Sequence, residues 1–211
     1  MLTEKLQSLL GTIGGQIAIV AIIALLLFAI MKISGKGNQS TKVLVTTSIL
    51  IALSFVLNKI SIVRMPQGGS ITPFSMLTLS LVGYLYGTRQ GIMAGVAVGL
   101  LDLLLGGYVV HPIQLLLDYP LGFAALGLSG LFRDKKNGLI TGYIAGVIGR
   151  YICVVISGIV FWGEFAPENF NALSWSLYYN ITYIGAEAVI TILILSVPSI
   201  KNLLIRLKQI A

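Results

Sequence analysis

The chain has 211 residues, of which 56% are hydrophobic and only 10% charged, and its formal net charge is +7. A soluble domain of this size carries about 25% charged residues, so the composition excludes an ordinary soluble protein and indicates an integral membrane protein. The apolar runs are continuous and lack the ten-residue alternation of a transmembrane barrel, which favours helices. The basic residues lie in short loops between these runs, so the positive charge indicates membrane topology rather than nucleic acid.

The first apolar run covers residues 9–33 and follows a short polar lead. We expect an uncleaved transmembrane helix here, because only Lys5 precedes the run and no clear cleavage site follows it; a signal peptide is the alternative. Residues 34–41 have the composition of a linker. Residues 1–41 therefore look like an addition to a membrane domain over 42–200.

The membrane domain is predicted to be an all-α bundle of six spans, with the N-terminal helix as a seventh. The six spans are expected at about 42–60, 72–88, 90–106, 112–132, 138–162 and 173–198. The second to fourth spans are short and rich in glycine, which favours close approach of helices in lipid. The tail 201–211 is predicted to be a basic amphipathic helix end at the membrane surface.

Basic residues orient this bundle in the membrane. With the linker before Lys42 in the cytoplasm, ten Lys and Arg residues fall inside and only Lys5, Lys59 and Arg64 outside. This bias predicts a plasma-membrane protein whose core has both ends in the cytoplasm and whose extra N-terminus is extracellular. The loops expected to face outward are 60–71, 107–111 and 163–172. The first of them has the turn residues of a structured loop, and we expect it to close over a pocket; a plain flexible hairpin at Gly68-Gly69 is the alternative.

Three acids, Asp102, Asp118 and Glu187, fall in or at the edge of predicted spans. A charge at the centre of a membrane helix costs roughly 2.5–3.5 kcal/mol, so such residues are paired, hydrated or bound to a ligand. For Asp102 a structural pair, for example with Arg150, stays open. For Asp118, the polar residues around it favour a ligand.

The polar residues around Asp118 lie in the stretch 108–119. A helix that starts near Pro112 puts His111, Gln114 and Asp118 on one face, with Tyr108 before that face and Tyr119 after the acid. His111 is interpreted as a residue at the start of the helix rather than as a ligand.

The last span and the end of the span before it also carry polar and aromatic side chains. Asn180 and Glu187 recur on one face of the last span, while Trp162 and Trp175 stand at the outer boundary. The alternative for the tryptophans is an aromatic belt. Carboxylates beside aromatic faces suit a flat organic cation, and the amides of Gln114 and Asn180 offer donors and acceptors to a heteroaromatic ring. The pattern predicts a pocket for a small cationic or zwitterionic aromatic molecule.

Enzyme signatures are absent from the sequence. It has no His-Glu-x-x-His helix, no Gly-x-Ser-x-Gly elbow and no phosphate-binding Gly-x-x-x-x-Gly-Lys loop. We therefore expect no catalytic residue, no metal site, no cofactor and no direct use of ATP.

Several motifs resemble those of one family. They are Met-Pro-Gln-Gly-Gly-Ser at 65–70, His-Pro-Ile-Gln-Leu-Leu-Leu-Asp-Tyr at 111–119, Gly-Arg-Tyr at 149–151, Ser-Gly-Ile-Val-Phe-Trp at 157–162, Phe-Ala-Pro-Glu at 165–168 and Trp-Ser-Leu-Tyr-Tyr-Asn at 175–180. Together they resemble the thiamine-specific S component of energy-coupling factor (ECF) transporters. The resemblance implies a six-helix membrane protein that binds thiamine from outside. A separate module of one membrane coupling protein and two ATPases would drive uptake.

The resemblance also implies roles for individual residues. Asp118 takes the place of an acidic ligand for the cationic vitamin, and the positions of four further residues match pocket residues: Tyr108, Tyr119, Trp162 and Asn180. Trp175 stands at a position often held by tyrosine, and Val154 stands where a histidine is expected.

Ser48 and Ala52 are the counterpart of a small-x-x-x-small surface that docks the coupling protein, with packing inside the bundle as the alternative. The leading hypothesis is a thiamine-binding transport subunit. The alternatives are an S component for another vitamin or pyrimidine precursor, and a membrane scaffold whose acids pair structurally.

Overall fold

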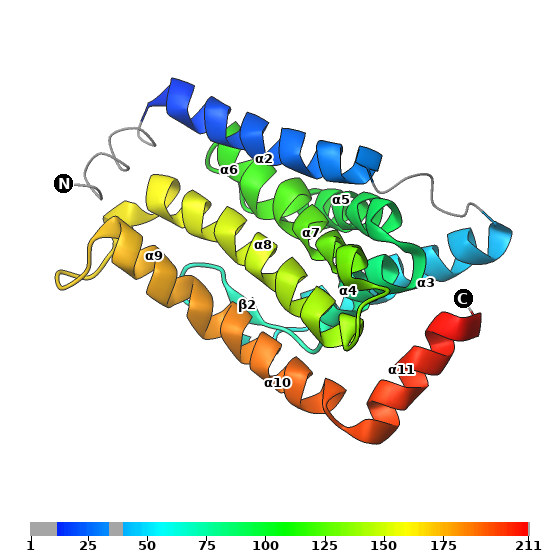
Figure 1. Cartoon of the computed structure of the whole chain (residues 1–211). Coiled ribbons are helices and arrows are strands. Elements are labelled where there is room, and N and C mark those ends of the chain that lie inside the picture. The colour runs from blue at the N-terminus through cyan, green and yellow to red at the C-terminus, as the bar shows by residue number, and fades with distance from the viewer. Residues whose placement is uncertain (1–11, 34–39, 211) are drawn as a thin grey trace.

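The computed structural model describes residues 12–33 and 40–210, and these residues form a bundle of helices with one short hairpin (Figure 1). The first half contains α2 (Ile13–Ile33), α3 (Thr41–Lys59), β1 (Val63–Arg64), β2 (Ser70–Ile71), α4 (Ser75–Tyr86) and α5 (Thr88–Leu104). The second half contains α6 (Pro112–Leu116), η1 (Leu117–Leu121), α7 (Gly122–Ala125), η2 (Leu126–Phe132), α8 (Gly138–Phe161), η3 (Gly163–Phe165), α9 (Ala172–Asn180), η4 (Ile181–Gly185), α10 (Ala186–Leu195) and α11 (Pro198–Ile210). Lys5 and most of the predicted linker lie outside the described residues.

The helices match the predicted spans. Five segments of the described chain are long and apolar enough to cross a membrane: Ile13–Lys32, Thr41–Lys59, Pro112–Phe132, Gly138–Phe161 and Ala172–Leu195. The other two predicted spans are α4 and α5, with 12 and 17 residues. At 1.5 Å per residue, α4 is about 18 Å long and shorter than the hydrocarbon core of a bilayer. The all-α membrane bundle is confirmed, and so are its short glycine-rich members.

Two of the spans are interrupted by π-helical turns. The span over Pro112–Phe132 changes to a π-helix at Leu117–Leu121, because Pro120 has no N–H to give to the α-helical ladder. The last span has a second π-helix at Ile181–Gly185, directly after Asn180. Such turns often occur at functional sites, since they redirect side chains within a helix. The sequence analysis missed both.

Glycines bring α4, α5 and η2 into backbone contact. A Cβ atom on Gly127 would lie 2.2 Å from the carbonyl carbon of Gly91, and one on Gly91 would lie 2.7 Å from the Cα atom of Gly83. Any side chain at these positions would separate the helices. The close helix approach that the glycines predict is therefore present.

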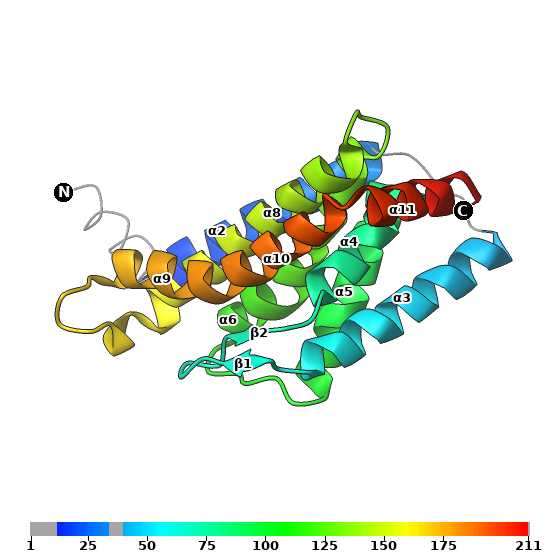
Figure 2. The ribbon, with the colours of Figure 1, turned by 90° about the horizontal axis from the view of Figure 1, so that it is seen from below.

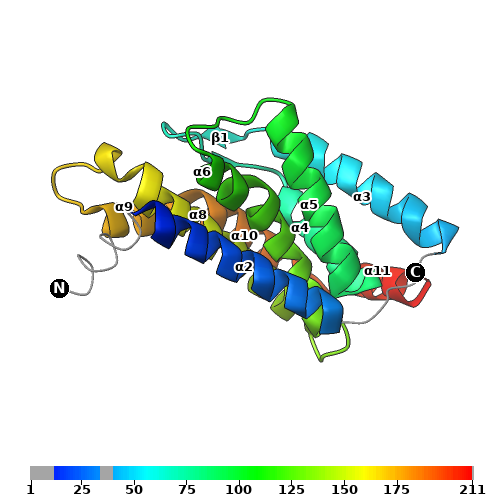
Figure 3. The same cartoon turned by 90° about the horizontal axis from the view of Figure 1, so that it is seen from above.

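The remaining helices cover this centre and mark its two ends. α2 lies along the outside of the bundle against α5, α6 and η1 (Figure 3), where Leu27 packs with Ile92 and Ala124. The tail forms α11, which turns away from α10 and crosses one end of the bundle (Figure 2). The hairpin and the first turns of α6 and α9 lie toward the other end. This second end carries the candidate site.

Candidate functional site

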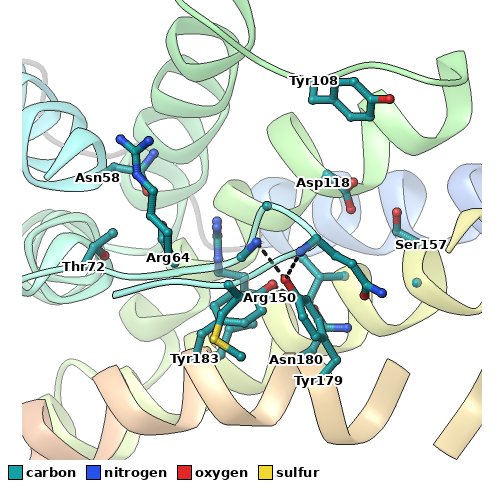
Figure 4. Close-up of a pocket in the computed structure, with 18 of the residues that line it drawn as sticks. Asn58, Arg64, Thr72, Tyr108, Asp118, Arg150, Ser157, Tyr179, Asn180 and Tyr183 are labelled. Carbon is teal, nitrogen blue, oxygen red and sulfur yellow. Dashed lines mark hydrogen bonds between the residues drawn. The ribbon is translucent and has the colours of Figure 1, made fainter. Parts of the chain in front are cut away.

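A cavity of about 920 Å³ opens between the hairpin, η1, α8 and the last span (Figure 4). It brings together all eight residues that the sequence predicts as ligand-binding: Tyr108, Gln114, Asp118, Tyr119, Trp162, Trp175, Asn180 and Glu187. The π-helical turns face each other across it, since Asp118 and Tyr119 belong to η1 and Tyr183 belongs to η4. The structure therefore gathers the predicted site, although it gives its members different neighbours.

Asp118 is held by an amide and forms no ion pair within the described part of the chain. Its Oδ2 atom accepts a hydrogen bond of 2.6 Å from Nε2 of Gln114, and the ion pairs found among the described residues do not include it. The Gln114 amide is otherwise engaged with the backbone: Oε1 accepts from the Val110 N–H and Nε2 donates to the Tyr108 carbonyl. Gln114 thus positions the carboxylate, and Asp118 faces the cavity without a partner cation.

The two tyrosines of this stretch fix the loop before α6. The Tyr119 hydroxyl accepts from the Tyr108 N–H at 2.7 Å and lies 3.2 Å from the Tyr108 carbonyl oxygen, to which it donates. The Tyr108 ring packs at 5.8 Å on Trp162. His111 caps α6, where Nδ1 accepts from the Ile113 N–H. This confirms its interpretation as a residue at the start of the helix.

Asn180 forms the opposite wall. Its Nδ2 atom donates to the Ser176 carbonyl at 2.8 Å, and its Oδ1 atom accepts from the Tyr183 hydroxyl at 2.7 Å. Nδ2 also donates to the Ser176 hydroxyl at 3.2 Å, so both N–H groups of the amide have partners and the second lone pair of Oδ1 remains. Asn180 is buried and lines the cavity, so a ligand ring can use what remains.

The hairpin between α3 and α4 is fastened over this wall. The Tyr179 hydroxyl accepts hydrogen bonds of 3.1 Å from the backbone N–H groups of Gln67 and Gly69 (Figure 4), and Trp175 donates from Nε1 to the side chain of Gln67. Gly69 has to be glycine, since a Cβ atom there would lie 2.6 Å from the Tyr183 ring. The predicted structured loop is confirmed as an ordered hairpin that lines the cavity.

Glu187 lines the cavity but is turned toward α4. Its carboxylate accepts from the Thr72 hydroxyl at 2.5 Å and from the Met76 N–H at 3.0 Å. The residue at the start of α4 is Phe74, which has a positive φ of 63° and no capping side chain. Free N–H groups at a helix start need acceptors and favour negative charge, and Glu187 supplies both from another helix.

The charged residues nearby correct one expectation. Asp102 forms a structural pair, the alternative left open for it, but its partner at 2.7 Å is Lys59 and not Arg150; the chain between α5 and α6 leaves the end of α5 beside the end of α3. Arg150 lies over the Phe123 ring, 3.9 Å from its centroid, and its Nη1 atom is buried without a hydrogen-bond partner among the described residues. Arg150 lines the cavity. Its position within a span was the one signal that could have identified it.

Three further positions that the sequence singled out differ in exposure. Val154 is buried on the cavity wall. Ser48 and Ala52 lie exposed on α3, whose buried residues are Val43 and Ser54. The two small residues are thus on the outside of the bundle and available to a partner. Within the described residues, no three His, Cys, Asp or Glu side chains are grouped to hold a metal.

The chain is similar to known proteins. The chain matches the model of the thiamine transporter protein family (Thia_YuaJ) over residues 44–206. It is 36% identical over 176 residues to the thiamine transporter ThiT of Bacillus subtilis strain 168, a match that covers 75% of this chain and 91% of that protein. It is 30% identical over 141 residues to ThiT of Lacticaseibacillus paracasei, over 59% of this chain and 70% of that protein.

A solved structure shares the fold. ThiT from Listeria monocytogenes superposes with a TM-score of 0.63 at 24% identity, over 77% of this chain and 98% of that one. α2 precedes the range that the family model matches. The apolar helices and the curated relatives agree on a multi-pass membrane protein, and the chain belongs to the thiamine transporter protein family.

Proposed function

We propose that this protein is the thiamine-binding S component of an ECF-type importer in the plasma membrane and that it takes up the vitamin from the extracellular side. One observation carries the proposal: in a chain of the thiamine transporter family, a carboxylate that forms no ion pair with any described residue faces an aromatic-lined cavity. Thiamine is an organic cation with two planar aromatic rings, and its thiazolium can supply the missing charge.

The cavity assigns a task to each wall. Asp118 offsets the positive charge of the thiazolium, and the rings of Trp162, Trp175 and Tyr108 offer faces on which a desolvated cation gains about 2 kcal/mol. Asn180 accepts a hydrogen bond from the amino group of the aminopyrimidine with the remaining lone pair of Oδ1. Tyr119 and Gln114 hold the loop and the carboxylate in place, and Glu187 stabilises the wall that follows the hairpin.

Transport needs a partner. In keeping with the absence of a phosphate-binding loop from this chain, ATPases on a separate membrane coupling protein supply the energy in this proposal, and the protein itself acts as a binding subunit without catalysis or a cofactor. The exposed positions Ser48 and Ala52 let another helix approach α3 closely. The excess of Lys and Arg at the α11 end supports a cytoplasmic position for that end and an outward-facing cavity.

A thiamine titration of the purified chain tests this function. Trp162 and Trp175 line the cavity, so bound thiamine should quench their fluorescence and calorimetry should give one site per chain. Val154 favours a second candidate, a related pyrimidine vitamin, because it removes an expected polar ligand. Binding of the isolated pyrimidine but not of thiamine would support that candidate. No binding of either would leave a membrane scaffold.

A further inference from the structure

A second cleft lies at the other end of the molecule from the thiamine cavity, between α11 and the loop 133–138 (Figure 2). Its volume is about 600 Å³. Four basic side chains and one acidic side chain line it: Arg133, Lys135, Lys201, Lys208 and Asp134. The proposed uptake of thiamine does not use this cleft.

Two lysines of α11 hold the cleft together. Nζ of Lys208 donates to Oδ1 of Asp134 at 2.9 Å and to the carbonyl of Arg133. Nζ of Lys201 donates to Oδ1 of Asn137 at 2.8 Å. These bonds join α11 to a loop more than 60 residues away in sequence, and they bring the basic groups to one place.

The cleft keeps an excess of positive charge. The hydrogen bond from Lys208 holds the pKa of the Asp134 carboxyl below its usual range, so the acid is ionised at neutral pH. Four positive charges against one negative leave +3. Nε of Arg133 is 3.7 Å from Asp134 and, within the described part of the chain, has no hydrogen-bond partner although it is buried. An anion with several acceptor oxygens would satisfy these groups.

The helix beside the cleft indicates where this anion comes from. Leu203 and Leu207 are one turn apart on α11 and are 58% and 40% exposed. A helix with exposed leucines and basic residues lies in the membrane surface, with its apolar side among the acyl chains. Lipid phosphates occupy the same depth, and basic groups at this level attract anionic lipids.

We propose that the cleft between α11 and the loop 133–138 binds the phosphate of an anionic phospholipid, such as phosphatidylglycerol, on the membrane face opposite the thiamine cavity. The leucines of α11 contact the acyl chains, and the basic side chains contact the phosphate oxygens. The bound lipid joins the end of the last span to the loop before α8.

Binding of phosphatidylglycerol and phosphatidylcholine to the full-length protein in detergent tests the proposal. Native mass spectrometry measures lipid binding, and thermal unfolding measures the melting temperature. We expect phosphatidylglycerol to bind and to raise the melting temperature, and phosphatidylcholine to do neither. The variants Arg133→Gln and Lys135→Gln keep both lysine bonds of α11, so the lipid-free melting temperature should not change. Each should weaken phosphatidylglycerol binding about fivefold, and the double variant about 25-fold.

Lys42→Gln is the matched control. It removes one charge at the start of α3, at the same end of the bundle (Figure 2) but outside the cleft, and it should change lipid binding less than twofold. An equal loss in the control would mean diffuse attraction and would overturn the proposal. The proposal would also be overturned if millimolar inorganic phosphate displaced the lipid and, in the absence of lipid, raised the melting temperature by itself. Normal lipid binding by the cleft variants, together with the loss of binding to a partner protein, would overturn the proposal as well.

Discussion

The two ends of the bundle are built from different contacts. At the end with α11, glycines of α4, α5 and η2 place backbone directly against backbone. At the cavity end, hydrogen bonds and aromatic contacts join the segments around the cavity: Tyr179 holds the hairpin, Glu187 caps α4 and Trp162 packs on Tyr108.

The difference follows from the physics of packing in lipid. Helices there gain little from burying apolar surface, so they associate through close van der Waals contact, which small residues permit. A cavity gives up such contact, and the polar groups around it need one another as partners. We therefore expect folding to depend on the glycine-packed end and ligand affinity to depend on the cavity end.

The largest effect is expected from Gly127→Val. Its added atoms would overlap the backbone of Gly91, with the first contact at 2.2 Å. Overpacking costs about 1–3 kcal/mol in ordinary cores and more where only backbone can yield, so we expect a loss of about 3 kcal/mol or more. Thermal unfolding measures it, with Gly14→Val as the control, because a Cβ atom there meets nothing within 4 Å. Similar melting temperatures for both variants would contradict the importance of the glycine contact.

Asp118→Asn should have the next largest effect, on affinity. Removing one partner of a buried charge pair costs about 2–5 kcal/mol, so thiamine binding should weaken by at least about 30-fold. The amide keeps the shape of the side chain and can still contact Gln114, so the melting temperature of the ligand-free protein should change little. Calorimetry measures the thiamine affinity, and thermal unfolding measures the melting temperature. An equal loss of affinity and stability would favour a structural acid.

Sequence reasoning predicted the parts of both ends that depend on local composition. Apolar runs gave helices within a few residues of their observed bounds, and the glycine-rich runs gave close packing. Polar residues in apolar surroundings identified the cavity lining, because a buried polar group requires a reason wherever the chain goes.

Partners across the fold were harder to predict. Asp102 pairs with Lys59. Glu187 accepts hydrogen bonds from Thr72, just before α4, and from Met76 in the first turn of α4, both more than 100 residues away in the sequence. These pairs depend on how the loops return, which no spacing shows. The π-helical turn at Pro120 had a visible cause that was overlooked, since proline inside a span disrupts its ladder.

A smaller effect is expected where the hairpin meets α9. Tyr179→Phe removes the acceptor for the N–H groups of Gln67 and Gly69, and a hydrogen bond contributes about 0.5–1.5 kcal/mol. If the hairpin retains the ligand, thiamine should dissociate about tenfold faster while association changes little. Stopped-flow fluorescence measures both rates. Tyr178→Phe is the neighbouring control, because its ring is exposed. Equal rates in both variants would mean that the hairpin does not retain the ligand.

The smallest effect is expected from Lys59→Gln, at the rim of the cavity. The pair with Asp102 joins α3 to α5, and its lysine side chain is 38% exposed, so solvent screening limits its value to about 1 kcal/mol or less. The variants Lys59→Gln and Asp102→Asn should each lower the melting temperature slightly, and the double variant should add little to either. Thiamine affinity should stay within about threefold in all three. A loss in Asp102→Asn as large as that in Asp118→Asn would instead make Asp102 a second counter-ion, and the ligand charge would then be shared between the rim and the interior of the cavity.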